Sequence, residues 1–277
     1  MLEGACIAVV VPAHDESALI RQVLDTIPAF VDHVIVVDDA SRDDTVAIAL
    51  KHPDPRVHVL RHPVNRGVGA AIATGYRIAV DAGAHIVAVM AGDGQMDPAD
   101  LPSVVRPVLD RVADYVKGVR LQHPDIHRMP LPRRVGTKVF GWATRHALGL
   151  PALTDSQCGY TAISADAIRK LDLQTLWPRF GYPNDLLGQL AMRGLRVAEV
   201  PVRPIYGQEK SELRARHALV IAWLIGRAAW RTRRPQSTGR WRLPPHDVGL
   251  QTSPEPTSLE PTSLEPTSLE PTSLEPT

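Results

Sequence analysis

The chain has 277 residues, of which 44% are hydrophobic and 22% are charged, as in an ordinary globular protein. Its net charge of +1 hides an asymmetry, because the part before Pro244 carries 31 basic residues against 24 acidic ones, a net charge of +7. A basic body favours anionic partners, but no nucleic-acid-binding motif is visible, so we expect no nucleic acid partner. Two cysteines do not make a disulfide framework, and no apolar run reaches the roughly 18 residues that span a bilayer, so we expect a cytoplasmic protein.

The first half of the sequence alternates apolar runs with amphipathic segments. Strands are predicted at residues 5–11, 31–37, 56–60, 85–90 and 113–117, and helices at residues 17–27, 43–51, 68–82 and 98–111. Ser17 is the predicted N-cap of the first helix. Because continuous Val and Ile runs flanked by helices are typical of buried parallel strands, we expect an α/β fold, with a Rossmann-like, mostly parallel sheet and helices on both faces.

The second half is less regular and ends in a repeat. Helices are predicted at residues 131–148, 165–171, 182–193 and 213–230, and strands at residues 160–163 and 196–200. Pro-Thr-Ser-Leu-Glu then occurs four times between Pro256 and Glu275, and proline at every fifth position excludes helix and sheet. We therefore divide the chain into a main domain at residues 1–207, a basic amphipathic C-terminal helix within residues 208–242 and a disordered acidic tail at residues 243–277.

Two acidic clusters directly follow predicted strands. Asp38 and Asp39 come after the second strand, and Asp93 comes after the fourth. The carboxyl ends of neighbouring parallel strands lie at the mouth of an open α/β sheet, where ligands bind. Hard oxygen ligands at that edge suit a divalent cation and the phosphates that it carries. The two clusters therefore predict a nucleotide-sugar site, and so an enzyme.

Four segments occur in a fixed order along the first hundred residues. They are residues 12–17 (Pro-Ala-His-Asp-Glu-Ser), 37–45 (Val-Asp-Asp-Ala-Ser-Arg-Asp-Asp-Thr), 62–71 (His-Pro-Val-Asn-Arg-Gly-Val-Gly-Ala-Ala) and 92–95 (Gly-Asp-Gly-Gln). The series resembles the family 2 glycosyltransferases, which have the GT-A fold. Within them it is most similar to the branch that contains dolichol-phosphate mannose synthase and bacterial polyprenyl-phosphate glycosyltransferases. The resemblance covers about residues 5–206.

The resemblance implies a donor site built from the first three segments. The residues that it places around the nucleotide are Pro12, Ala13, Glu16, Asp39, Asn65, Gly67 and Gly69. Within this set, Glu16 would line the nucleoside pocket and Asp39 would face the base or the ribose. The stretch at 65–69 would let the backbone lie close to the nucleotide.

The metal-binding motif of similar proteins is incomplete in this chain. Its usual form is Asp-Ala-Asp-Gly-Gln, and here Ala91 stands in the place of the first acid while Asp93 is kept. Because Mg²⁺ often needs only one or two protein carboxylates, with phosphates and water completing its shell, the resemblance still implies Mg²⁺ or Mn²⁺. Asp93 would be the principal ligand and a catalytic residue, and Gln95 the second ligand. Asp97 is predicted to cap the next helix instead of binding the metal.

The charge pattern in the middle of the chain favours an anionic acceptor. A hydroxyl acceptor must lose a proton to a positioned base, whereas a lipid monophosphate, with a second pKa near ~6, is already largely dianionic and needs cations. The stretch Arg128, Arg133, Arg134 and Lys138 supplies such cations, and the residues assigned to the acceptor phosphate are Lys117, Arg120, Arg134, Lys138 and Gln157. Arg134 and Lys138 are four apart and share a helical face. A solvated basic surface is the alternative interpretation of these cations.

Two further acids each have two interpretations. Asp155 lies in the segment 154–160, which resembles the acceptor-side loop of the same branch, and it would act either as a base or as a group that orients a cation. Asp185 follows Asn184 where many family 2 enzymes have Glu-Asp, the motif that commonly supplies their catalytic base. Its alternative interpretation is an acid in the first turn of a helix.

The predicted helix near residues 213–230 is apolar and ends in arginines. Trp223 and Trp230 are seven residues apart and share a helical face. An apolar helix with tryptophans and a polybasic end suits the surface of a membrane, so we expect peripheral association at its inner face. A core-packing helix with a basic end is the alternative.

Together these patterns predict an inverting glycosyltransferase. It would move a sugar from a nucleotide diphosphate sugar, of the GDP-mannose or UDP-glucose type, to a polyprenyl phosphate of the dolichol or undecaprenyl type. Two alternatives stay open. The same fold would serve a hydroxyl acceptor, a glycan or a small molecule, with Asp185 as the base. A nucleotide-binding protein without catalysis is suggested by Ala91.

Overall fold

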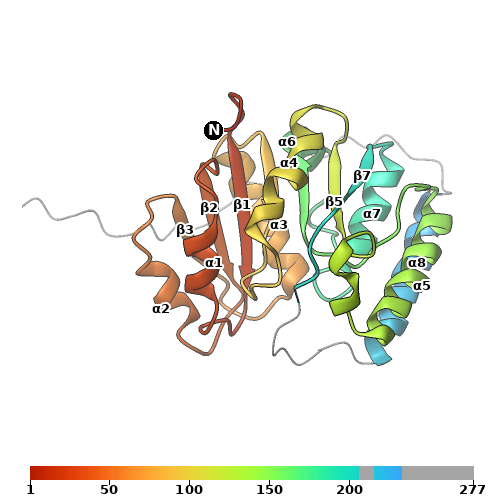
Figure 1. The fold of residues 1–277 in the computed structure, drawn as a ribbon, viewed down its shortest axis with the longest axis horizontal. Helices are drawn as coiled ribbons and strands as arrows, with labels where there is room; N and C mark the ends of the chain where they lie inside the picture. The colour runs from red at the N-terminus through yellow and green to blue at the C-terminus, as the bar shows by residue number, and fades with distance from the viewer. Residues whose placement is uncertain (206–214, 233–277) are drawn as a thin grey trace, which may run out of the picture.

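One seven-stranded sheet organises the molecule. The computed structural model describes residues 1–205 and 215–232. Its strands lie in the order β3-β2-β1-β4-β6-β5-β7 (Figure 1). Their bounds are β1 (Ile7–Ala13), β2 (His33–Asp38), β3 (Val57–Arg61), β4 (Ile86–Val89), β5 (Tyr115–Val119), β6 (Thr161–Ser164) and β7 (Val197–Pro201). Strands β1 to β4 pair in parallel, as do β5 and β7, whereas β6 runs antiparallel to β4 and β5. The predicted mostly parallel sheet is confirmed, with one reversed strand inside it.

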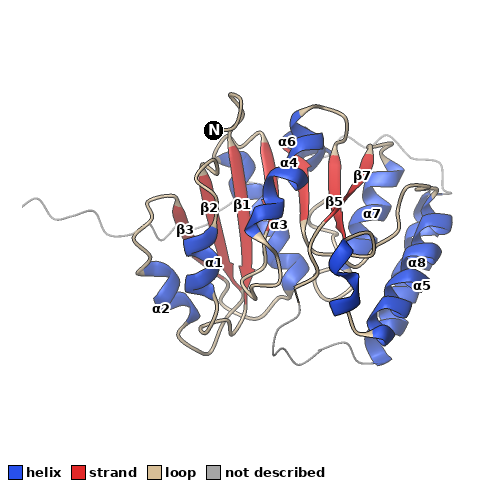
Figure 2. Ribbon diagram, in the orientation of Figure 1, coloured by secondary structure: helices blue, strands red, loops and turns tan. Residues whose placement is uncertain are grey.

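Helices cover both faces of this sheet (Figure 2). Their bounds are α1 (Ile20–Thr26), α2 (Thr45–Leu50), α3 (Val68–Asp81), α4 (Leu101–Leu109), α5 (Leu131–Leu148), α6 (Ala165–Lys170), α7 (Tyr182–Met192) and α8 (Ala215–Thr232). Two short 3₁₀ turns, η1 (Pro98–Asp100) and η2 (Pro124–Arg128), precede α4 and α5.

The central strand β1 shows how the sequence builds two cores. Side chains alternate across a strand, so Ile7, Val9 and Val11 fall into the apolar cluster shared with α1 and α4. Ala8 and Val10 fall into the second cluster, which contains residues of α3, α6 and α7. All five are fully buried, and this explains why the strand reads as a continuous apolar run.

The start of the first helix differs from the prediction. Ser17 is not its N-cap, because α1 begins at Ile20 and the preceding Leu19 makes no side-chain cap. The backbone amides of residues 15–17 instead donate to side chains of the loop after β2 and of the first residue of α2, and the Ser17 amide donates to Asp43 Oδ2 over 3.0 Å. These tertiary hydrogen bonds delay the helix by three residues. Asp97 does cap η1 as predicted, since its carboxylate accepts from the Ala99 amide.

The C-terminal helix packs beside the main domain. Helix α8 lies against α5 and α7 (Figure 1). No helix among the described residues is long and apolar enough to cross a membrane. The predicted tail at residues 243–277 lies outside the described residues, as do residues 206–214 before α8 and residues 233–242 after it.

The register of the parallel strands places the site. Ala13 at the end of β1 is paired with Asp38 at the end of β2, and Val10 of β1 is paired with Val89 at the end of β4. The segments that follow these strands therefore leave the sheet at the same edge. This is the edge at which open α/β sheets bind ligands.

The contact between α3 and β1 yields a first prediction. A Cβ atom at Gly75 would lie 2.3 Å from Cγ1 of Val10, closer than any packed pair allows. We expect Gly75→Ala to lower the free energy of unfolding by about 1–3 kcal/mol, and Val10→Ala in the same chain to recover part of this loss. Thermal and urea denaturation would measure both.

Gly136→Ala is the matched control for that substitution. Gly136 is also inside a helix, α5, but no atom lies within 4 Å of its added Cβ. Alanine there should leave stability unchanged or raise it by up to about 1 kcal/mol. A Gly75→Ala protein as stable as wild type would contradict the packing described for β1.

Candidate active site

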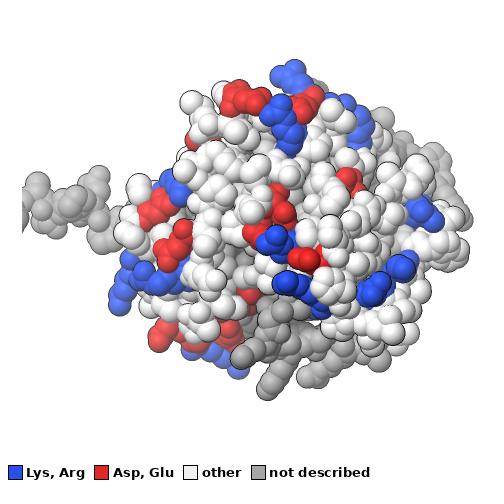
Figure 3. All heavy atoms as spheres, in the orientation of Figure 1, with Lys and Arg blue, Asp and Glu red and all other residues white. Residues whose placement is uncertain are grey.

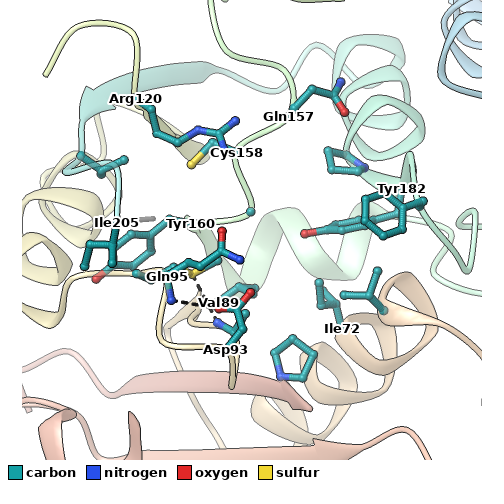
Figure 4. A pocket seen from close by; sticks show the side chains of 18 of the residues that line it. Ile72, Val89, Asp93, Gln95, Arg120, Gln157, Cys158, Tyr160, Tyr182 and Ile205 are labelled. Atoms are coloured by element: carbon teal, nitrogen blue, oxygen red, sulfur yellow. Dashed lines mark hydrogen bonds between the residues drawn. The ribbon is translucent and has the colours of Figure 1, made fainter. Parts of the chain in front are cut away.

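A cavity of about 240 Å³ opens at the carboxyl edge of the sheet (Figure 4). Pro12 at the end of β1 and Val89 at the end of β4 line it, together with Ile72 of α3 and Tyr182 of α7. Its charged lining residues are Asp93, Arg120, Arg133 and Arg203. Among the described residues that line it, three arginines thus accompany a single carboxylate, and the cavity favours an anionic ligand.

The Asp93 turn forms one side of the cavity. Asp93 Oδ1 accepts a hydrogen bond from the Gln95 amide over 3.0 Å, and Gly94 between them has a φ of 68°. Figure 4 shows the side chains of Asp93 and Gln95 on one side of the cavity, with Arg120 and Gln157 across from them. Burial raises the pKa of the Asp93 carboxyl, and the Gln95 amide and the positive charge of Arg133 oppose this rise.

The donor set around Asp93 limits what metal chemistry is feasible. Among the described residues, no group of three or more His, Cys, Asp or Glu side chains could hold a metal ion. Asp93 and Gln95, the two ligands predicted from the sequence, offer one carboxylate and one amide oxygen. Such a set fits Mg²⁺ or Mn²⁺ only when phosphate oxygens of a ligand complete the coordination shell.

Arg120 is held in the cavity wall by Asp155. Nε and Nη2 of Arg120 donate to the two carboxylate oxygens over 2.8 and 3.0 Å, a bidentate pair. Asp155 itself is fully buried and also accepts from the amides of Gln157 and Cys158. Asp155 does not line the cavity, and its buried pairing with Arg120 favours the second of its two interpretations, a group that orients a cation, over a base.

Lys117 corrects the sequence-based assignment. It was expected to contact phosphate, but its side chain is fully buried and its ammonium group donates to the Cys158 carbonyl. Burial lowers the pKa of Lys117, opposed by the neighbouring Asp155 and Glu199. The side chain of Lys117, on β5, points into the core. All five residues of β5 are buried, so the sequence of this strand shows no alternation of apolar and polar positions that would have predicted the burial of Lys117.

Arg133, and not Arg134, is the helix α5 cation in the cavity. Arg133 lines it, whereas neither Arg134 nor Lys138 does. Lys138 instead lines a separate surface hollow with Trp142 and Arg145. The buried positions of α5 are Thr137, Gly141, Thr144 and Leu148. Arg133 lies four residues, or about one turn, before Thr137 and therefore on the same face of α5. The spacing of Thr137, Gly141, Thr144 and Leu148 in the sequence could have identified this buried face of the helix.

Asp39 acts on the loop before α3. It is 3% exposed, and its carboxylate accepts from His62 Nδ1 over 2.7 Å and from the amides of Arg66 and Gly67 over 2.9 and 2.6 Å. Burial opposes ionisation, yet these hydrogen bonds keep the pKa of Asp39 below its ordinary value. The expectation that Asp39 faces the base or ribose is not met by this geometry, in which the carboxylate fixes the backbone of residues 66–67.

The two glycines before and within α3 are needed for a protein contact. A Cβ at Gly67 would lie 2.5 Å from the Pro178 carbonyl oxygen, and one at Gly69 would lie 2.3 Å from that of Trp177. Gly67 also has a φ of 98°, a conformation that favours glycine. In the structure the close neighbour of these glycines is the backbone of the segment before α7, and the expected approach to a nucleotide stays a prediction.

The remaining nucleotide-site candidates lie at the same edge of the sheet. Pro12 lines the cavity and Ala13 is 4% exposed, next to Gly92. Glu16 and Asn65 do not line it. The Glu16 amide donates to Thr45, and the Asn65 side chain contacts His14 Nε2 over 3.2 Å.

Asp185 and Asn184 turn away from the cavity. Asp185 is 1% exposed, and its carboxylate accepts from the Trp177 amide over 2.9 Å and faces Arg227 and Arg231 of α8. Asn184 is fully buried, and its side-chain oxygen accepts from Thr144 of α5. Asp185 is therefore an acid of the first turn of α7, and it is not placed as the base of a hydroxyl acceptor.

The Arg120–Asp155 pair gives a prediction for stability. Asp155→Asn removes the charge partner of a mostly buried arginine and should cost about 3–5 kcal/mol of unfolding free energy at pH 7. Burial of Asp155 raises its pKa, but the positive charge and the hydrogen bonds of Arg120 outweigh this effect. The folded-state pKa of Asp155 therefore lies below its ordinary value. Its contribution is therefore complete above the ordinary Asp pKa of about 3.9 and is lost as the pH falls toward the lower folded value. Urea denaturation of both proteins from pH 7 downward should show their difference shrinking only below about pH 4. A difference that does not vary with pH would contradict the ion pair.

Comparison with known proteins agrees with this geometry. A family model described as Glycosyl transferase family 2 matches residues 8–171. The UDP-N-acetylglucosamine–dolichyl-phosphate N-acetylglucosaminyltransferase of Methanococcus voltae is 31% identical over 216 residues, which are 72% of this chain and 86% of that protein. The undecaprenyl-phosphate mannosyltransferase of Micrococcus luteus is 36% identical over 180 residues, which are 61% of this chain and 70% of that protein.

A solved structure supports the fold assignment. Glucosyl-3-phosphoglycerate synthase from Mycobacterium tuberculosis, in complex with Mn²⁺, UDP-glucose and phosphoglyceric acid, aligns with a TM-score of 0.62 and 26% sequence identity. The alignment covers 81% of this chain and 80% of that chain. The chain described here therefore belongs to glycosyltransferase family 2, and it is a hexosyltransferase with the GT-A fold.

Proposed function

We propose that this enzyme transfers one sugar, with inversion, from a nucleotide diphosphate sugar to a polyprenyl phosphate. One observation carries the proposal. Arg120 and Arg133 line the cavity opposite or beside Asp93, whereas both acids that sequence reasoning considered as bases, Asp155 and Asp185, are buried and paired with arginines. The site is thus equipped to hold an anionic acceptor and poorly equipped to deprotonate a hydroxyl group.

The chemistry of a phosphate acceptor matches this equipment. A phosphate monoester has a second pKa near ~6 and is largely dianionic at neutral pH. One of its oxygens forms a bond to the anomeric carbon of the sugar, while the bond from that carbon to the donor diphosphate breaks. The electron pair of the broken bond leaves with the nucleoside diphosphate. No proton has to be removed, so no general base is required.

Three of the four charged residues of the cavity have a role in this proposal; the fourth, Arg203, is paired with Asp97 and Asp125. Arg120, fixed by Asp155, and Arg133 of α5 bind and orient the acceptor phosphate, together with Gln157, whose backbone amide donates to the same Asp155. Asp93 and Gln95 hold Mg²⁺ or Mn²⁺ together with the donor diphosphate. The Mycobacterium tuberculosis neighbour was solved with Mn²⁺ and UDP-glucose, which supports a divalent ion. When bound, such an ion neutralises the charge that develops on the departing diphosphate.

The donor side is proposed from the first three segments of the chain. Glu16 and Asn65 contact the nucleoside, and Pro12 and Ala13 provide the apolar wall beside it. Asp39 contributes by fixing the backbone at residues 66–67. The relatives named above use an N-acetylglucosamine or a mannosyl donor, so both nucleotide classes belong in the test.

The central experiment measures transfer to lipid. Purified protein is incubated with Mg²⁺ or Mn²⁺, undecaprenyl phosphate and one labelled donor per tube: GDP-mannose, UDP-glucose or UDP-N-acetylglucosamine. We expect label in the organic phase with one donor, and loss of that label with EDTA. Asp93→Ala should lower the rate by at least about 100-fold, because the charge on the leaving diphosphate is then less well compensated. Nucleotide release without label in the organic phase would point to a hydroxyl acceptor and overturn the proposal.

Neighbouring arginines of α5 provide a matched pair of variants for the same assay. Arg133→Gln should raise the KM for undecaprenyl phosphate about tenfold or more, since a charge-assisted contact to phosphate is lost. Arg134→Gln, one residue away but outside the cavity lining, should change it little. The reverse ranking would place the acceptor phosphate elsewhere on α5.

We further propose that α5 and α8 form the face that meets the membrane. Seven of the twelve exposed large apolar side chains of the described residues lie on these two helices: Leu131, Val135, Val139, Trp142, Leu219, Trp223 and Trp230. Within each helix they recur at spacings of three, four or seven and form one stripe. Neither helix contains Asp or Glu, and the region over α5 in Figure 3 carries basic side chains on an otherwise uncharged surface.

Vesicle flotation tests this face. The protein should float with vesicles that contain phosphatidylglycerol, and the double variant Val139→Ser/Trp142→Ser should reduce its partitioning roughly tenfold, because two exposed apolar side chains no longer enter the interface. Val64→Ser is the control, since Val64 is equally exposed but lies before α3. Equal losses for control and double variant would show that the α5 stripe is not the contact.

A further inference from the structure

The loop at residues 177–181 joins the cavity to the C-terminal helix. On one side it covers the start of α3: the Ala70 amide donates to the Pro178 carbonyl over 3.1 Å, and Gly67 and Gly69, before and within α3, leave room for this backbone. Phe180 and Gly181 also line the cavity. The loop is therefore a wall of the proposed donor site, although it follows α3 by about one hundred residues.

Asp185 fastens this loop from behind. Its Oδ2 accepts the Trp177 amide over 2.9 Å, while Oδ1 faces Arg231 Nη1 at 3.5 Å and Arg227 Nε at 4.0 Å. The two carboxylate oxygens thus divide between the loop and α8. With the side chain only 1% exposed, the two arginines provide the charge that compensates its burial.

Helix α8 contacts the same loop through apolar groups. The Trp177 and Trp223 rings lie 5.6 Å apart, edge to face, and the Arg227 guanidinium lies 5.4 Å from the centre of the Trp223 ring. Gly181 is in direct contact with α8, since a Cβ there would be 2.6 Å from Leu224. The loop is therefore held between α3 and α8, with Asp185 at the junction.

We propose that Asp185 is a positioning residue of the donor site and that α8 is part of that site. The inference rests on the proposed function for the identity of the donor as a nucleotide sugar. Asp185 acts through the Trp177 amide, and it transmits the position of α8 to the loop and so to the start of α3. It makes no contact with the reacting atoms. An Asp at the start of α7 thus serves to hold the loop at residues 177–181 in place through the Trp177 amide.

The two roles of Asp185 predict different kinetics. A base gives up its function when it becomes an amide, so kcat falls by at least about 100-fold while the donor KM stays the same. A positioning residue affects how well the donor site is formed. For Asp185→Asn we therefore expect the donor KM and the Kd for the free nucleoside diphosphate to rise about tenfold, with kcat and the acceptor KM changed by less than about threefold.

Hydrogen exchange followed by mass spectrometry tests the positioning without any substrate. In Asp185→Asn and Asp185→Ala, peptides that cover residues 177–181 and 66–71 should exchange faster than in wild type, while β1 and β4 keep their protection. Asp166→Asn is the matched control, because Asp166 is also a first-turn acid but is exposed and, in the part of the chain that the structure describes, pairs only with Arg169 of its own helix α6. It should change neither segment.

Arg231 offers a milder variant that the fold will tolerate, since its side chain is 30% exposed. Arg231→Gln should shift donor affinity and loop exchange in the same direction as Asp185→Asn, and Arg231→Lys should restore both in part. Unchanged exchange in the loop together with a collapse of kcat would overturn the positioning role. If wild type binds neither GDP nor UDP, the proposed function fails, while the exchange data still decide whether Asp185 positions the loop.

Discussion

The contact between the loop at 177–181 and the start of α3 is the constraint on which the site depends. Two carbonyl oxygens of this loop occupy the space where Gly67 and Gly69 lack a side chain. Any larger residue would push the loop away from the sheet, and with it the N-terminus of α7 and Tyr182 in the cavity. The same contact joins the part of the chain that forms the parallel strands β1 to β4 to the second half, which contains the antiparallel strand β6. The cavity forms at this junction.

Charge in the site follows a single pattern, in which buried carboxylates support cations. Asp155 fixes Arg120, and Glu199 in turn accepts from the amides of Thr154 and Asp155, so that the loop cannot rotate. Removing a carboxylate from water is costly unless partners are supplied, and here they are arginine and backbone amides. The result is a cavity whose positive charge is presented by preorganised side chains. Such an arrangement suits chemistry in which both acceptor and leaving group are phosphates.

The fold was predictable where local pattern and tertiary packing agree. The bounds of α5 match the prediction, since its proline start and Gly149 end are strong local signals. Strands β1, β2, β4 and β5 could be located because they are buried on both faces and therefore read as continuous apolar runs. Ser17 was misassigned because Asp43 and its neighbours, in a different loop, compete for the amides that a helix N-cap would have satisfied.

The sequence by itself determined the family, the sheet and the edge at which the site lies, because motif order and hydrophobic periodicity are properties of the chain. The tertiary structure alone decided the role of individual charged residues. Arg133 faces the cavity while Arg134 does not, Lys117 is buried, and Asp39, Asp155 and Asp185 are engaged by protein partners. These outcomes depend on which groups from distant segments surround each side chain. A charge gains its function from those neighbours, and neither its residue type nor its position in the chain reveals them.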